Sequence, residues 1–255
     1  EQRIFYYGKD VGPAITALNQ HHKVSAELKP YPAPTEYVEQ ETGGNVFFVD
    51  YDMVQAKMLF LAKGSPFKTE NMAASDLFNS YFGDIVFQDI RESKSLAYST
   101  YAYYADASEK GKSNYVLAYL GAQANKMPQA VDAMMTLMND MPEAKEQFNA
   151  SKESILKQIA ADRITKSDIF WTLESFNQSG IKMSDIEKKY KAIQNMTMDD
   201  LKAFFNENIK GEEYNVIVIG NKKDIDMKSL SKLGKIQEMD VDYLFNYEKA
   251  EKIKQ

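Results

Sequence analysis

The chain contains no cysteine and only two histidines among its 255 residues. The lack of cysteine excludes disulfide bonds, thiolate zinc sites and cysteine nucleophiles. The two histidines, His21 and His22, are adjacent, so on a helix their side chains point about 100° apart and do not readily share a metal ion. Neither lies in an H-x-x-E-H or H-E-x-x-H pattern. We therefore interpret both as surface residues and do not expect histidine-based zinc catalysis by this chain alone.

The sequence also lacks a basic excess and any long apolar run. It has 37 acidic and 31 basic residues, which gives a formal net charge of −6 and argues against a nucleic-acid partner. No segment approaches the roughly 20 apolar residues that a membrane-spanning helix needs. Cysteine-free chains occur on both sides of a membrane, so the composition is compatible with the bacterial periplasm and with the cytoplasm.

The hydrophobic pattern that is present predicts strands and helices in an irregular order. Gly83 and the run at 63–66 are expected to end the elements that precede them. Because the order is not a regular βαβ alternation, we predict an α+β fold with two layers, a mainly antiparallel sheet with helices packed on one face. The predicted strands lie at 3–7, 45–49, 53–62, 96–105, 114–122 and 214–219, and the helices at 11–20, 69–82, 84–91, 127–138, 143–165, 167–179, 185–194, 201–208 and 227–233.

The beginning of the chain is similar to its end. RIFYYG at 3–8 and NVIVIG at 215–220 are each followed by a helical pattern, with a leucine ten residues after the glycine. Strand–glycine–helix is a common arrangement, so chance is the alternative explanation. If the similarity is a repeat, the chain is a piece of a longer protein. Its parts would be the terminal strand and helix of a preceding, mostly absent repeat at 1–25, a linker at 26–44, a second domain at 45–245 and a tail at 246–255.

The segment FQDIRESKSLAYSTYAYY, residues 87–104, places a predicted helix end beside a predicted strand start. The short connection can bring Arg91 and Tyr98 close together. A guanidinium is a fixed fork of donors and a tyrosine hydroxyl can donate, so the pair can hold a carbonyl oxygen or an oxyanion. Spacing alone favours the simpler interpretation, in which Arg91 caps a helix and Tyr98 is a structural strand residue.

The pattern F-x-x-I-R-E-x-K-x-L-A-Y-S at 87–99 resembles the C-terminal-domain signature of the pitrilysin/insulinase family of inverted-zincin, mitochondrial-processing-peptidase-like zinc metallopeptidases. The Tyr-Phe-Gly before it, the run at 190–201 and the VIVIGN near 220 also fit that domain. The chain departs from the family at Ser95, where relatives usually have glycine, and in the compact segment after Gly83.

This resemblance implies that Arg91 and Tyr98 contact the substrate backbone and stabilise the tetrahedral intermediate. It also implies that the zinc of the intact enzyme is bound by an N-terminal half through H-x-x-E-H, and that the two halves close around a peptide. This chain has no H-x-x-E-H, so we expect it to bind no zinc and to be inactive by itself. The expected partners are the zinc-carrying N-terminal half or a homologous subunit, and a peptide substrate.

A second hypothesis stays open, in which the chain is a non-catalytic family subunit that binds peptides or supports assembly. Retention of both Arg91 and Tyr98 favours the substrate-clamping part of a peptidase, whereas a stand-alone hydrolase would need a nucleophile motif such as G-x-S-x-G, which is absent. The methionines and Trp171 are interpreted as core residues. The acidic residues Glu36, Glu39 and Glu41 are interpreted as part of a solvated connector and not as a metal site, because no histidine accompanies them.

Overall fold

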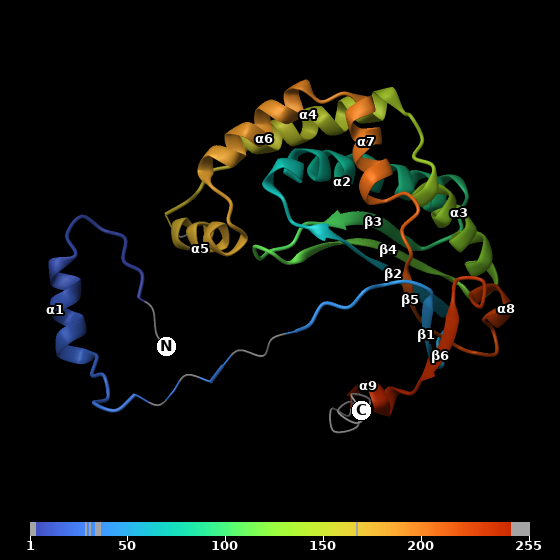
Figure 1. The fold of residues 1–255 in the computed structure, drawn as a ribbon, viewed down its shortest axis with the longest axis horizontal. Coiled ribbons are helices and arrows are strands. Elements are labelled where there is room, and N and C mark those ends of the chain that lie inside the picture. Colours follow the sequence, from blue (N-terminus) through green and yellow to red (C-terminus); the bar gives the residue numbers. More distant parts are fainter. Residues whose placement is uncertain (1–3, 29, 31, 34–36, 167, 246–255) are drawn as a thin grey trace.

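The computed structural model describes residues 4–28, 30, 32–33, 37–166 and 168–245 (Figure 1). A mixed six-stranded sheet runs in the order β3-β4-β2-β5-β1-β6. Three of its five neighbouring pairs, β3–β4, β4–β2 and β2–β5, are antiparallel and the other two are parallel. The predicted α+β class and the mainly antiparallel sheet are thus confirmed. The strands are β1 (Asn45–Asp50), β2 (Gln55–Pro66), β3 (Ser99–Ala105), β4 (Ser113–Gln123), β5 (Asn215–Gly220) and β6 (Lys235–Met239).

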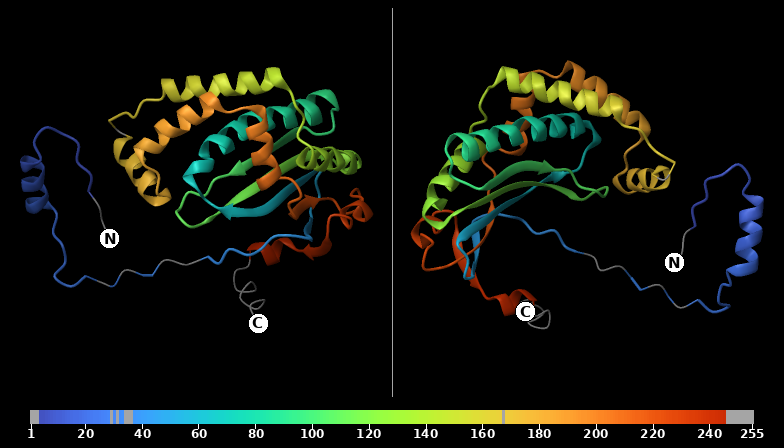
Figure 2. Two further views of the ribbon diagram at one scale, coloured as in Figure 1. Left: turned by 45° about the horizontal axis from the view of Figure 1, so that its top comes forward. Right: turned by 180° about the vertical axis from the view of Figure 1, so that it is seen from behind.

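The major helices lie on one face of this sheet, as predicted (Figures 1 and 2). Helices α2 and α3 pack directly against it, and α4, α6 and α7 pack against α2. None of the helices in the described part of the chain is both long and apolar enough to cross a membrane. The bounds are α2 (Met72–Val86), α3 (Met127–Asn139), α4 (Lys145–Ala161), α5 (Ile169–Ser179), α6 (Met183–Asn195), α7 (Met198–Asn208) and α8 (Met227–Leu230), with short 3₁₀ turns η1 (Thr69–Asn71) and η3 (Ala124–Lys126).

The core lies between the sheet and the helices. Strand side chains alternate between the two faces, so Phe48 and Phe60 are fully buried under the helices while Ile217 on the opposite face is 42% exposed. Met134 and Met138 of α3 are buried in this core, which confirms that these methionines fill space between helix and sheet. Because the apolar side chains are buried on one face of the sheet, the sheet needs covering helices on that face alone.

Two predicted element ends are wrong, both at glycines. Helix α2 continues through Gly83 to Val86 and then into a π-helix, η2 (Phe87–Ser93). A glycine inside a helix costs roughly 0.5–1 kcal/mol, but the helix beyond it buries Val86 and Ile90 completely, and each such side chain contributes about 1.5–3 kcal/mol. Strand β2 likewise runs past Gly64 to Pro66, because Pro66 falls at the strand end, after a register shift, where proline is tolerated.

The strand predicted at 3–7 is not formed. Residues 4–7 have no regular secondary structure, and Arg3 lies outside the described residues. A strand needs a neighbouring strand for its backbone hydrogen bonds, and the described residues place none beside this segment. Phe5 instead contacts the rings of Phe170 and Trp171 in α5, at centroid distances of 5.1 and 6.0 Å. The predicted helix at 11–20 is present as α1 (Gly12–His21).

The division into 1–25, 26–44 and 45–245 stays a prediction, and the predicted tail at 246–255 lies outside the described residues. Strand β6 and the short helix α9 (Val241–Phe245) were not predicted. The pattern of β6 is weak because it has no fully buried residue. The prediction that Trp171 is a core residue is wrong, since its side chain is 67% exposed on α5.

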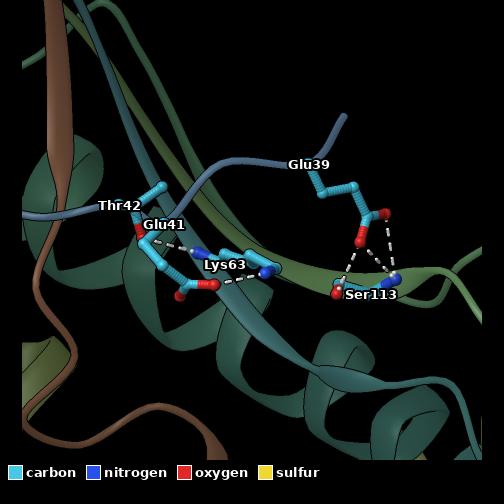
Figure 3. A network of polar contacts seen from close by, with 5 residues as sticks. All are labelled: Glu39, Glu41, Thr42, Lys63 and Ser113. Carbon is cyan, nitrogen blue, oxygen red and sulfur yellow. Dashed lines mark hydrogen bonds and ion pairs between the residues drawn. The ribbon is translucent and has the colours of Figure 1, made fainter. Parts of the chain in front are cut away.

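The segment before β1 is fastened to the sheet by its acidic residues (Figure 3). Glu39 accepts hydrogen bonds from the backbone N–H and the hydroxyl of Ser113, at 3.0 and 2.8 Å. Glu41 forms an ion pair with the Lys63 ammonium at 2.5 Å, and the Thr42 hydroxyl accepts from the Lys63 N–H at 2.8 Å. Glu41 is solvated as predicted, with 85% of its side chain exposed, but Glu39 and Glu41 also attach the segment to strands β4 and β2. The third acidic residue of the predicted connector, Glu36, lies outside the described residues.

Candidate functional site

Arg91 is held by the π-helix η2. Ile90, the residue before it, is completely buried and fixes this turn to the core. The Arg91 guanidinium lies over the ring of Phe87, 4.9 Å from its centroid, and its Nε is 3.6 Å from Glu92 Oε1. These contacts leave the side chain 47% exposed. The π-helix is a rare geometry that occurs frequently at functional sites.

A strained turn connects η2 to β3. The Leu96 N–H donates to the Ile90 carbonyl at 2.9 Å, which closes the turn onto the helix. Ser95 inside it has a φ of 50°, in the left-handed region that favours glycine. For a residue with a Cβ this conformation costs roughly 1–2 kcal/mol. The Lys126 ammonium donates to the Ser95 carbonyl at 3.0 Å and fastens the turn to η3.

Tyr98 follows this turn, immediately before β3. Its N–H donates to the Gly121 carbonyl at 2.8 Å, so the hairpin pairing of β3 and β4 already fixes its backbone. Its side chain stays exposed, with 52% of the residue accessible to solvent. The Tyr98 hydroxyl accepts a hydrogen bond of 2.7 Å from Gln123 Nε2, which comes from the last residue of β4.

Arg91 and Tyr98 line the same pocket, which has a volume of about 360 Å³. The structure therefore brings together the two residues that the sequence singled out, although they come from different secondary-structure elements. The pocket is lined by Arg91, Glu92, Ser95, Leu96, Ala97, Tyr98, Gln123 and Lys126.

Hydrogen-bond donors dominate the polar lining of this pocket. Arg91 and Lys126 bring two positive charges and Glu92 brings one negative charge. Arginine and lysine are donors without an acceptor, while the Tyr98 hydroxyl can donate as well as accept. Chemically, the arrangement suits a ligand that presents acceptors, such as a peptide carbonyl oxygen or an oxyanion.

Sequence reasoning did not identify Gln123 and Lys126. They are separated from Tyr98 by more than twenty positions and belong to no recognisable motif. The only signal for Gln123 is the hairpin itself, because antiparallel pairing of β3 and β4 places the end of β4 beside the start of β3. The side-chain contact could not be predicted without the register.

The described residues do not fit a zinc site. Among them, no group of three or more histidine, aspartate or glutamate side chains is placed to hold a metal ion. His21 ends α1 and His22 follows it, and both are exposed. A catalytic zinc site typically has three protein ligands of these types, so zinc chemistry has no donor set in this part of the chain.

The sequence model for the peptidase M16 inactive domain matches residues 14–155, more than half of the chain. The chain belongs to the peptidase M16 family. This is the pitrilysin-type family that the Arg91/Tyr98 motif resembles, so the resemblance is confirmed. Family enzymes are proteolytic and generally zinc-dependent. No protein with curated annotation matches the chain.

Solved structures of the family share the fold. The peptidase M16 inactive domain from Pseudomonas fluorescens is 15% identical with a TM-score of 0.62, and the match covers 75% of this chain and 47% of that one. The periplasmic protease PqqL from Escherichia coli is 14% identical with a TM-score of 0.62, and the match covers 84% of this chain and 25% of that one. A chain of complex III2 from Candida albicans is 12% identical with a TM-score of 0.57, and the match covers 89% of this chain and 57% of that one. The matched region thus spans between about a quarter and three fifths of these relatives.

Proposed function

We propose that this chain is the C-terminal, substrate-clamping part of a zinc-dependent peptidase that hydrolyses peptides in a closed chamber. The observation that carries the proposal is that Arg91 and Tyr98 line the same pocket. Membership of the peptidase M16 family supports it, because the family is proteolytic. In this proposal the zinc ligands belong to an N-terminal half or a homologous partner subunit.

Each of the two residues has a role that its geometry supports. The Arg91 guanidinium, held by the Phe87 ring, presents its fork of N–H groups to the carbonyl oxygens of an extended substrate. The Tyr98 hydroxyl, half-exposed at the pocket, donates to the oxygen on which negative charge develops when the peptide bond is attacked. A preorganised donor of this kind is worth about 10²–10³ in rate.

The origin of the zinc ligands is part of the proposal. The described residues of this chain have no donor set for a metal, whereas two of the solved relatives above are at least twice as long as the region that matches. A partner that carries H-x-x-E-H, either on the same polypeptide or on a separate one, would complete the enzyme. Hydrolysis would then depend on both halves.

The experiment is to purify the complete assembly that contains this chain from its native source. We expect stoichiometric zinc by elemental analysis and peptide hydrolysis that a chelator abolishes. An Arg91→Met variant of the assembly should retain its zinc but lose most hydrolysis, because methionine keeps the aliphatic length and removes the donors. An Arg91→Met variant with full activity would contradict the proposed clamping role.

A non-catalytic subunit is the second candidate. The match to an M16 domain described as inactive, together with the similarity to a complex III chain, favours it. The two candidates differ in one measurement on the same assembly. A zinc-free assembly that binds peptides without hydrolysing them would establish the non-catalytic subunit and exclude the peptidase.

A further inference from the structure

We propose that Gln123 is a positioning residue that holds the Tyr98 hydroxyl as a hydrogen-bond donor toward the pocket. This inference rests on the proposed function, since it concerns the same site. Gln123 is the last residue of β4, and its side-chain Nε2 lies 2.7 Å from the Tyr98 hydroxyl oxygen. Both side chains line the pocket that also contains Arg91.

The direction of this hydrogen bond is the central point. A phenol hydroxyl has one proton and can accept through its oxygen lone pairs. The Gln123 amide donates its N–H to that oxygen, so it occupies an acceptor position and leaves the phenol proton free. The hydroxyl can then donate its own proton to a substrate oxygen. Because the hydroxyl already accepts one bond, its rotation is restricted and its donation is stronger, as expected for hydrogen bonds in series.

The contact does not have the features of a core interaction. Tyr98 is 52% exposed and the bond to Gln123 is itself exposed to solvent, where a hydrogen bond adds only about 0.5–1.5 kcal/mol to stability. The buried Tyr81 hydroxyl, in contrast, both donates to the Pro142 carbonyl and accepts from the Ala144 N–H. The Tyr98 hydroxyl instead accepts a hydrogen bond from Gln123 and keeps its own proton for donation, which fits a role toward a ligand.

The decisive variant is Gln123→Glu, which keeps the size of the side chain and reverses its hydrogen bonding. An ionised carboxylate only accepts, so the Tyr98 hydroxyl must turn its proton to residue 123 and away from the substrate. Gln123→Met removes the hydrogen bond but leaves the hydroxyl free. Gln88→Glu introduces the same charge within η2, on a residue that lines a different pocket, and serves as the matched control.

In the complete, zinc-loaded assembly, we expect Gln123→Glu to lower kcat about as much as Tyr98→Phe does, at least tenfold, with KM changed less than threefold. Gln123→Met should lower kcat only two- to fivefold, and Gln88→Glu should lower it less than twofold. In the Tyr98→Phe background, Gln123→Glu should have no further effect, because its target is already gone. Thermal unfolding of each variant shows that the fold is retained.

Equal effects of Gln123→Glu and Gln123→Met, or an undiminished effect of Gln123→Glu in the Tyr98→Phe background, would overturn the positioning role. Failure of the proposed function has a different signature, because Tyr98→Phe itself would then leave kcat unchanged. A readout without the partner separates the two cases. In this chain labelled with ¹³C at tyrosine Cζ, Gln123→Glu should move the Tyr98 signal further toward the ionised-tyrosine position than Gln123→Met does, and equal signals would overturn the inference.

Discussion

Two tyrosines at opposite ends of β3 have contrasting surroundings. Tyr104 is 1% exposed, and its hydroxyl donates to Asn208 Oδ1 at 3.3 Å and accepts from Asn114 Nδ2 at 3.0 Å. Tyr98 is 52% exposed, and its hydroxyl accepts from Gln123. A hydroxyl that already donates within the protein has no proton left to donate to a ligand. The same side chain is thus structural at one end of the hairpin and available for chemistry at the other.

The backbone also differs between the two ends of β3, since it is firmly held at Tyr104 and strained before Tyr98. The Asn79 side chain of α2 accepts a hydrogen bond from the Tyr104 backbone N–H at 2.7 Å and donates one to the Tyr104 carbonyl at 2.9 Å. These two bonds satisfy the backbone groups of Tyr104 at the open edge of β3. The segment before β1 is attached nearby, through Glu39 and Ser113. At Tyr98 the chain leaves a π-helix through the strained Ser95. Strain of this kind persists only where surrounding structure imposes it and is concentrated at functional sites.

The largest expected effect separates the two tyrosines by activity. Tyr98→Phe in the complete assembly should lower kcat at least tenfold, and up to about 10²–10³ if the hydroxyl stabilises an oxyanion. The melting temperature should fall only by a few degrees at most, because the lost hydrogen bond is exposed and adds only about 0.5–1.5 kcal/mol. Tyr103→Phe is the control, because Tyr103 is an exposed tyrosine of the adjoining strand β3 and does not line the pocket. An unchanged kcat in Tyr98→Phe would make Tyr98 structural.

The second effect is the converse, at Tyr104. Tyr104→Phe removes the Tyr104 hydroxyl from the buried Asn208 Oδ1 and Asn114 Nδ2, which should lower the free energy of unfolding by about 1–3 kcal/mol. Urea denaturation of the chain measures this change. At a temperature where the variant is folded, kcat of the assembly should stay within twofold of the wild-type value. A stability loss as small as that of Tyr98→Phe would remove the distinction between the two ends.

A third, smaller effect concerns the strain at Ser95. Ser95→Gly should raise the free energy of unfolding by about 0.5–1 kcal/mol, because glycine adopts the left-handed conformation without the Cβ clash, offset in part by its greater freedom when unfolded. Ser95→Ala keeps the Cβ and is the control, with no gain expected. If Ser95→Ala stabilised as much as Ser95→Gly, the backbone at this position would not be the source of strain.

The smallest effect tests the attachment near the Tyr104 end. Hydrogen bonds from the Ser113 N–H and then its hydroxyl hold the pKa of Glu39 below its usual value. A carboxyl with a lowered pKa in the folded state adds stability above its unfolded pKa of about 4.3, and this stability is lost as the pH falls through the folded pKa. Ser113→Ala should raise the Glu39 pKa toward the usual value in an NMR titration, whereas Ser65→Ala should not.

The sequence predicts the order of the main elements because their hydrophobic patterns are strong. The two strands of the β3–β4 hairpin are examples, and so is α7, which begins where the Thr197 and Asp200 side chains each accept a hydrogen bond from the other's backbone N–H. The exposed edge strand β6 has almost no pattern and could not be found. Local propensity predicts a helix end at Gly83, because it does not include the burial gained beyond that residue.

The candidate site was predictable only in part, for a similar reason. Arg91 and Tyr98 lie in one local motif, so a short turn is enough to bring them into one pocket. Gln123 and Lys126 reach that pocket through the register of the hairpin and the turn after it, which no local pattern encodes. The π-helix and the left-handed Ser95 are departures from local preference that the surrounding packing imposes.

The central claim is that this chain supplies substrate-binding donors and that the metal chemistry comes from elsewhere. The most direct test is to purify the chain alone, equilibrate it with zinc, and measure bound zinc and the cleavage of a mixed peptide library. The account predicts no stoichiometric zinc and no hydrolysis. Stoichiometric zinc together with proteolysis that a chelator abolishes would contradict it.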